Sequence, residues 1–270
     1  RDRLMSFTPQ SGPPVPPQAE KHGGGGGMDG ATEVLRLTYR YAGIDWLERE
    51  DEILLSEYDR DRRWRTTHRV NFGEPVLGDV ICDLSVNDAY GDPGNPVGVP
   101  QPDGRRLVRC DGEAIYLSGA GATPEGNRPF LDRFDLGTRE KTRLFESGEE
   151  GYEGFVTFVG DELLISRQNR TTPTNFFIGE RALTQFTDPH PHLTGMHKEL
   201  VRYSRPDGVP LSGTLYLPPG YEIGSGVRLP LLFWAYPEEY SDASTAGQVR
   251  GSDKTFTRLA GTSPLWFAAR

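Results

Sequence analysis

Arg-Tyr-Ser-Arg-Pro-Asp-Gly-Val-Pro-Leu-Ser-Gly-Thr-Leu-Tyr-Leu-Pro, residues 202–218, has the pattern of a β-hairpin. Two alternating runs flank Arg205-Pro-Asp-Gly208, a turn in which proline presets φ and glycine accepts a positive φ. The next apolar run, Leu229-Pro-Leu-Leu-Phe-Trp-Ala-Tyr236, is nearly continuous, as is typical of a strand covered on both faces. The hairpin, the buried strand, a long loop and a new amphipathic segment predict the opening of an α/β-hydrolase-like sheet.

A catalytic serine is missing from this part of the chain. An α/β-hydrolase presents its nucleophile in Gly-x-Ser-x-Gly, because small residues permit a strained turn between strand and helix. The nearest match, Gly261-Thr-Ser-Pro-Leu265, lacks the second glycine and has proline after the serine. We interpret Ser263 as the N-cap of a helix at residues 264–270. A complete Ser-His-Asp set cannot be assembled from the residues of this chain.

Residues 32–187 have the pattern of short strands separated by turns. An acid, an apolar strand and a serine recur at residues 51–56, 113–118 and 161–166, and a second strand follows each at residues 64–70, 130–136 and 175–179. The spacing is near the ~40–50 residues of propeller blades. About three blades fit, which predicts a partial all-β propeller, and an ordinary sandwich of meanders is the alternative.

The composition divides the chain into three regions. Residues 1–30 contain a proline-rich run and five consecutive glycines, and are predicted to be a flexible linker or loop. Residues 31–190 form the predicted partial propeller, and residues 191–270 the start of the catalytic domain. The boundary follows from Asp188-Pro-His-Pro-His192, because alternating prolines cannot continue a central strand.

Composition excludes some classes of partner. The formal net charge of −9 and the pI near 5.2 disfavour a nucleic-acid binder, which needs clustered Lys and Arg. No apolar run approaches the ~20 residues that cross a bilayer, so no membrane association is expected. Two cysteines, Cys82 and Cys110, favour a reducing compartment over a secreted disulfide framework. The chain starts at Arg1 rather than Met, so a removed targeting segment would not be visible.

Tyr236 is one candidate functional residue. It ends the predicted buried strand, and residues at the carboxyl end of a sheet strand face the crevice where ligands bind. A phenol there can donate a hydrogen bond to an oxyanion. The alternative is an aromatic side chain that packs in the core.

Arg250, within Ala246-Gly-Gln-Val-Arg-Gly251, is the second candidate. Its guanidinium, on a loop bounded by glycines, can form a bidentate pair with an acidic substrate side chain. A surface ion pair is the alternative.

A metal site is not expected. His190, His192 and His197 have a spacing that could bind a metal. The intervening prolines, and the lack of a nearby Cys or paired carboxylate, favour a plain interdomain loop.

Five strings of residues resemble a known family. They are Tyr-Gly-Asp-Pro-Gly-Asn-Pro (90–96), a run beginning Leu-Ser-Gly-Ala-Gly-Ala (117–135), the hairpin with its flank (202–221), Leu-Phe-Trp-Ala-Tyr-Pro-Glu-Glu-Tyr (232–240) and Ala-Gly-Gln-Val-Arg-Gly-Ser (246–252). Together they resemble the chloroplast-type glutamyl endopeptidases, a branch of the prolyl oligopeptidase family of serine peptidases. The match is dense from about residue 87 onward.

This resemblance implies a β-propeller stacked on an α/β-hydrolase domain, and cleavage after Glu by a Ser-His-Asp triad. It implies that Tyr236 is an oxyanion-hole donor, that peptides or unfolded proteins are substrates, and that no metal or organic cofactor is used. It implies the chloroplast stroma, and without it the cytoplasm would be expected. It also implies that the triad lies in the later part of the catalytic domain, beyond Arg270, so we expect this chain alone to be an inactive fragment. The alternatives are a non-catalytic propeller interaction module and an acylaminoacyl or dipeptidyl peptidase.

Overall fold

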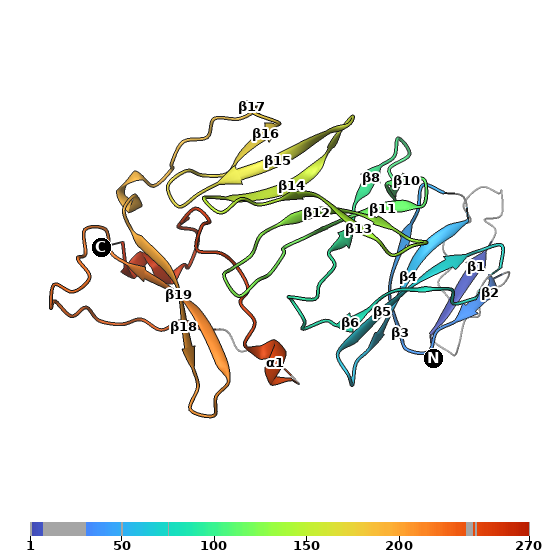
Figure 1. Cartoon of the computed structure of the whole chain (residues 1–270), viewed down its shortest axis with the longest axis horizontal. Coiled ribbons are helices and arrows are strands. Elements are labelled where there is room, and N and C mark those ends of the chain that lie inside the picture. Colours follow the sequence, from blue (N-terminus) through green and yellow to red (C-terminus); the bar gives the residue numbers. More distant parts are fainter. Residues whose placement is uncertain are drawn as a thin grey trace, which may run out of the picture. The chain divides into compact units, whose positions relative to one another are not determined.

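A computed structural model describes residues 2–7, 31–49, 51–74, 76–235, 240 and 242–269. Within the predicted linker, Arg3–Phe7 form strand β1, and residues 8–30 lie outside the described residues. Strands dominate the described part (Figure 1). None of the described helices is long and apolar enough to cross a membrane.

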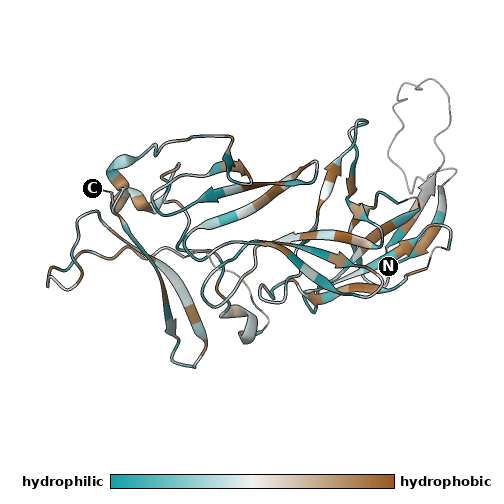
Figure 2. Cartoon of the chain, turned by 45° about the horizontal axis from the view of Figure 1, so that its top comes forward, coloured by the Kyte–Doolittle hydropathy of each residue, from teal (hydrophilic) through white to brown (hydrophobic). Residues whose placement is uncertain are grey.

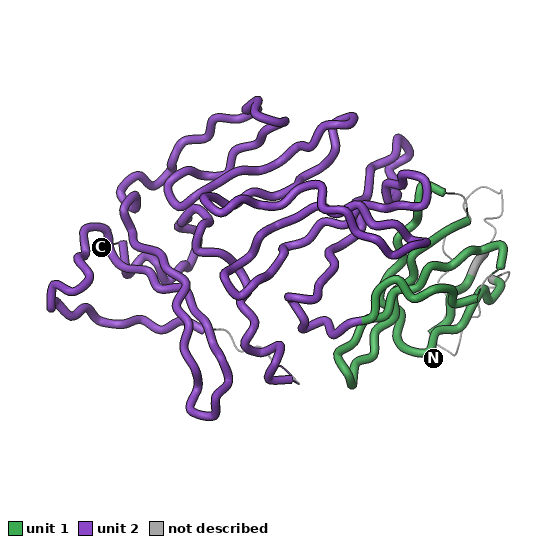
Figure 3. The backbone as a smooth tube through the Cα atoms, in the orientation of Figure 1, with its two compact units in different colours: residues 1–83 green, residues 84–270 purple. Residues whose placement is uncertain are grey.

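The chain separates into two compact units, residues 1–83 and 84–270, which we describe one at a time (Figure 3). The predicted boundary between residues 190 and 191 falls inside the second unit and stays a prediction.

The first unit contains a strand pair and a four-stranded sheet. β1 pairs with β2 (Ala31–Arg36), and the sheet has the order β3 (Arg40–Trp46), β4 (Glu52–Asp59), β5 (Trp64–Asn71), β6 (Val80–Ser85). A core cluster of this unit contains the buried residues Leu35, Leu37, Ile53, Leu55 and Val70. The alternation of apolar and polar residues along the strands is visible in Figure 2.

The second unit begins with two more antiparallel sheets. One has the order β10 (Cys110–Asp111), β11 (Ala114–Gly119), β12 (Phe130–Asp135), β13 (Lys141–Glu146), with β7 (Asn95–Pro96) also on β11; β8 (Gly98–Pro100) pairs with β9 (Arg106–Val108). The other has the order β14 (Tyr152–Val159), β15 (Glu162–Gln168), β16 (Asn175–Ile178), β17 (Arg181–Ala182). The two sheets meet where Tyr116 packs edge-on against Phe158, with ring centroids 4.9 Å apart.

The repeated sequence pattern corresponds to a repeated structural unit. Its three copies form strands β4, β11 and β15, and the strands predicted to follow them are β5, β12 and β16. Each of the three sheets contains a meander of four antiparallel strands, with consecutive strands as neighbours. This is the architecture of a propeller blade. The predicted all-β, blade-type organisation is therefore confirmed.

The predicted hairpin is also confirmed. β18 (His197–Ser204) pairs with β19 (Pro210–Leu217). In the turn, Gly208 has a φ of 85° and its N–H donates to the carbonyl of Arg205 at 2.8 Å. A short 3-10 helix, η1 (Pro191–Leu193), precedes the hairpin.

The predicted buried strand at residues 229–236 is wrong for the part that is described. Residues 229–235 form no strand, and the side chains of Leu231, Phe233 and Trp234 are 83%, 74% and 71% exposed. An apolar run becomes a buried strand only where neighbouring strands cover it. No strand among the described residues pairs with residues 229–235.

Ser263 is an N-cap, as predicted. Its hydroxyl accepts a hydrogen bond from the N–H of Leu265 at 3.3 Å, and Pro264 occupies the first position of the helix. The helix, η2 (Pro264–Phe267), is a 3-10 helix and is shorter than the predicted span of 264–270.

Candidate functional site

The site that contains Arg250 is built around residues 246–256, which we call the docking segment. It follows α1 (Ala243–Ala246), whose N-cap Asp242 accepts from the N–H of Ser244 at 2.8 Å. From there the docking segment contacts loops of both sheets of the second unit and then the β18–β19 hairpin. All these contacts lie within residues 84–270.

Gln248 binds the loop that leads from β6 to β7. Its side-chain oxygen accepts from the backbone N–H of Ala89 at 2.6 Å and of Tyr90 at 3.3 Å. Its side-chain nitrogen donates to a carboxylate oxygen of Asp88 at 2.7 Å. A primary amide has separate acceptor and donor atoms, so Gln248 can accept and donate at the same time without a charge. The adjacent N–H of Val249 donates to the hydroxyl of Tyr90 at 2.8 Å.

Asn127, in the loop between β11 and β12, binds the docking segment on the C-terminal side of Arg250. Its backbone N–H donates to the carbonyl of Gly251 at 2.7 Å, and its side-chain oxygen accepts from the N–H of Gly251 at 3.0 Å. Gly126 approaches the same carbonyl closely: a Cβ at this position would lie 3.3 Å from it, and its φ is 120°. A side chain at residue 126 would therefore disturb the contact.

Arg250 lies between these two anchors. One of its terminal nitrogens donates to the carbonyl of Asn87 at 2.7 Å, and its guanidinium lies over the ring of Tyr240, 5.6 Å from the centroid. The side chain is exposed, and within the described part of the chain no carboxylate forms an ion pair with it. A guanidinium has five N–H donors, so several remain for a ligand. The surface ion pair that sequence alone also allowed is not formed with any described residue.

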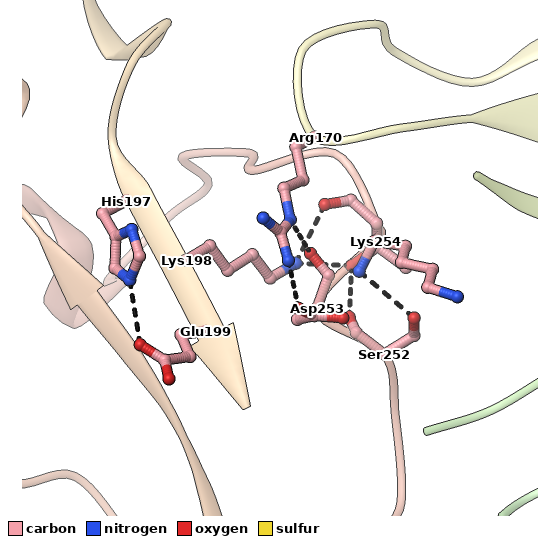
Figure 4. A network of polar contacts seen from close by, with 8 residues as sticks. Arg170, His197, Lys198, Glu199, Ser252, Asp253 and Lys254 are labelled. Carbon is pink, nitrogen blue, oxygen red and sulfur yellow. Dashed lines mark hydrogen bonds and ion pairs between the residues drawn. The ribbon is translucent and has the colours of Figure 1, made fainter. Parts of the chain in front are cut away.

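Two basic side chains, Lys198 and Arg170, hold the C-terminal part of the docking segment (Figure 4). The buried Lys198 of β18 donates to the carbonyl of Thr255 at 2.9 Å and to its hydroxyl at 2.6 Å. Arg170 forms an ion pair with Asp253 and donates to its carbonyl at 3.1 Å. Burial lowers the pKa of Lys198, while the nearby carboxylate of Asp253 opposes this shift.

The other candidates from the sequence are not assembled into a site here. Tyr236 lies outside the described residues, so its predicted role stays a prediction. The rings of His190 and His192 meet edge-on with centroids 6.0 Å apart, whereas His197 bonds to Glu199 at 3.0 Å. Within the described ranges, no three His, Cys, Asp or Glu side chains form a group that could hold a metal.

Gln248, Asn127 and Lys198 are site residues that the sequence analysis did not single out. The family resemblance nevertheless pointed to Gln248 and Asn127, because both lie in strings of residues that carry it. Three of the strings that carry the family resemblance, residues 90–96, 117–135 and 246–252, contact one another in the structure through Tyr90, Asn127 and the docking segment.

Comparison with known proteins agrees with this resemblance. No protein-family model matches the sequence. Over 262 residues the chain is 36% identical to "Probable glutamyl endopeptidase, chloroplastic" of Oryza sativa subsp. japonica, which covers 88% of this chain. The chain is a relative of the chloroplast-type glutamyl endopeptidases. A protein of the same name from Arabidopsis thaliana is also 36% identical, over 263 residues and 88% of this chain. The chain spans 28% of the rice relative and 27% of the Arabidopsis relative.

Solved structures with some similarity include two oligopeptidases. Oligopeptidase B from Trypanosoma brucei has a TM-score of 0.41 at 11% identity, covering 74% of this chain and 35% of that chain. Oligopeptidase B from Leishmania major has a TM-score of 0.37 at 8% identity, covering 72% and 34%. The relationship to glutamyl endopeptidases rests on the sequence identity.

Proposed function

We propose that this chain is part of a serine-type endopeptidase that cleaves peptide bonds after Glu. The observation that carries the proposal is the 36% identity to proteins named glutamyl endopeptidase along 88% of the chain. The chain contains no Gly-x-Ser-x-Gly. In this proposal it therefore contributes substrate recognition and structural support to the enzyme, and not the nucleophile. The attacking serine and its His and Asp partners belong to another part of the enzyme.

In this proposal residues 31–190 belong to the propeller, and residues 191–270 begin the α/β-hydrolase domain. The exposed apolar side chains of residues 229–235 support this division. Contiguous apolar surface of this kind normally marks an interaction site. We assign Tyr236, at the end of this segment, the role of an oxyanion-hole donor.

Arg250 is the residue we assign to recognition of the substrate glutamate. Its guanidinium is exposed, and among the described residues it contacts the carbonyl of Asn87 and the ring of Tyr240. A planar guanidinium matches a carboxylate through two parallel hydrogen bonds, which a neutral glutamine cannot accept in the same way. The substrates in this account are peptides and unfolded proteins, with no metal or organic cofactor.

The chloroplast is the proposed compartment, since both relatives carry the word chloroplastic in their names. Within the chloroplast we propose the stroma.

The test uses the full-length gene product and a series of fluorogenic peptides that differ only in the residue before the cleaved bond. We expect turnover with Glu, little turnover with Gln, Ala or Pro, and loss of activity with a serine-directed phosphonate. Preference for Ala or Pro would instead indicate an acylaminoacyl or dipeptidyl peptidase. No turnover of any peptide would indicate a non-catalytic propeller module. The 270-residue chain alone serves as the control and should be inactive.

A further inference from the structure

The geometry around Arg250 has a specific feature: the residues on either side of it are anchored, whereas its own side chain is exposed. Gln248 and Val249 bind the loop at residues 88–90, and Gly251 binds Asn127. The backbone at residue 250 is therefore held from both sides by groups that belong to the propeller-type sheets. None of these anchors uses the free donors of the guanidinium.

Of these anchors, Gln248 is matched most closely to its surroundings. Its oxygen faces two backbone N–H groups and its nitrogen faces the carboxylate of Asp88. The same oxygen of Asp88 also accepts from the N–H of Gly91 at 3.1 Å, which shapes the loop that receives Gln248. Methionine has nearly the same volume and length as glutamine but cannot replace any of these hydrogen bonds.

We infer that Gln248 is a positioning residue for Arg250 and thereby sets the preference for glutamate. This rests on the proposed function, in which Arg250 binds the substrate carboxylate. Bidentate recognition depends on a guanidinium that is already oriented, and a misplacement of about 1 Å in such a group can cost on the order of 10²-fold in rate. Gln248 provides this orientation through the backbone of residues 249 and 250, without contacting the substrate.

The experiment measures carboxylate recognition directly in the full-length gene product. Two peptides that end in Glu or Gln, and are otherwise identical, compete with the fluorogenic substrate, and the ratio of their inhibition constants reports the preference. We expect Gln248→Met to reduce this ratio about tenfold, a typical consequence of losing a few hydrogen bonds that orient a charged group.

Gln168→Met is the matched control. The side-chain oxygen of Gln168 accepts from the N–H of Phe256 at 3.0 Å, so the same chemical change loosens the same docking segment at its opposite end. We expect the control to keep the preference of the unsubstituted enzyme. An equal loss of preference in the control would overturn a specific role of Gln248.

A double-mutant cycle separates positioning from a general structural effect. If Gln248 acts through Arg250, Gln248→Met should have no further effect on the preference in the Arg250→Met background. An additive loss would overturn the inference. If Gln248→Met does not fold, Gln248→Glu keeps oxygens for the two N–H groups and places a carboxylate against Asp88; it should also lower the preference.

The outcomes distinguish this inference from the proposed function. An unsubstituted enzyme without a preference for Glu would contradict both. An enzyme whose preference is lost in Arg250→Met but kept in Gln248→Met would contradict the positioning role alone.

Discussion

Lys198 and Thr255, separated by 57 positions in the sequence, are joined by two hydrogen bonds: Nζ of Lys198 lies 2.9 Å from the carbonyl oxygen and 2.6 Å from the hydroxyl of Thr255. The lysine is 4% exposed, so its cation lies under the surface of the hairpin. The contact ties the β18–β19 hairpin to the docking segment that carries Arg250. Loss of one buried partner leaves the other unsatisfied, which makes such a contact costly to break.

Lys198→Met should therefore destabilise the protein by about 1–3 kcal/mol at neutral pH, because the carbonyl of Thr255 loses its buried donor. Urea denaturation of the two proteins measures the difference. A variant as stable as the unsubstituted protein would show that the apolar packing of methionine compensates for the lost bonds.

The stabilising effect of Lys198 should also depend on pH. Burial lowers its pKa in the folded state below the ordinary 10.5, so the unfolded chain binds a proton more tightly. Between these two pKa values the stability contributed at this position rises with pH. Tyr216, whose ring lies 5.8 Å from the ammonium, has a pKa raised by burial above the ordinary 10.0 and acts in the opposite sense above that pH. Denaturation at several pH values just below 10, relative to Lys198→Met, should show the rise; a flat difference would contradict it.

Two glycines with similar backbones but different surroundings provide a test of the loop that carries Asn127. Gly121 and Gly160 have φ values of 57° and 62°, yet a Cβ at 121 would lie 2.0 Å from the carbonyl oxygen of Arg128, whereas at 160 nothing lies within 4 Å. Gly160→Ala should cost about 1–2 kcal/mol, the cost of a left-handed backbone. Gly121→Ala should cost clearly more, since the loop must also shift. Equal losses in thermal denaturation would contradict the loop geometry.

Ser263→Ala tests whether this serine has only a capping role. Removing an N-cap costs about 0.5–2 kcal/mol of stability. We expect that loss in the purified chain, together with an unchanged turnover number in the full-length gene product. A large fall in turnover without a fall in stability would return Ser263 to the candidate nucleophiles.

Tyr236→Phe tests the proposed oxyanion-hole donor in the full-length gene product. Loss of one such donor reduces turnover on the order of 10²–10³-fold with little effect on KM. Steady-state kinetics with the Glu peptide measures both constants. An unchanged turnover number would instead assign Tyr236 to core packing.

The sequence predicted those features that depend on local patterns. Alternation and turn residues are local, so the strands of the three repeats, the turn at Gly208 and the cap at Ser263 could all be located. The exposure of residues 229–235 could not, because burial depends on neighbouring strands rather than on the run itself. The pairing of Gln248 with Asp88 spans 160 positions, and no local pattern indicates which polar residues meet at that distance.

The most direct test of the central claim is the mapping of cleavage sites by mass spectrometry after the full-length gene product digests an unfolded protein. We expect the new C-termini to be glutamates, and Arg250→Met to spread the cleavages over other residues. New C-termini without enrichment of glutamate, or with enrichment of another residue, would contradict it.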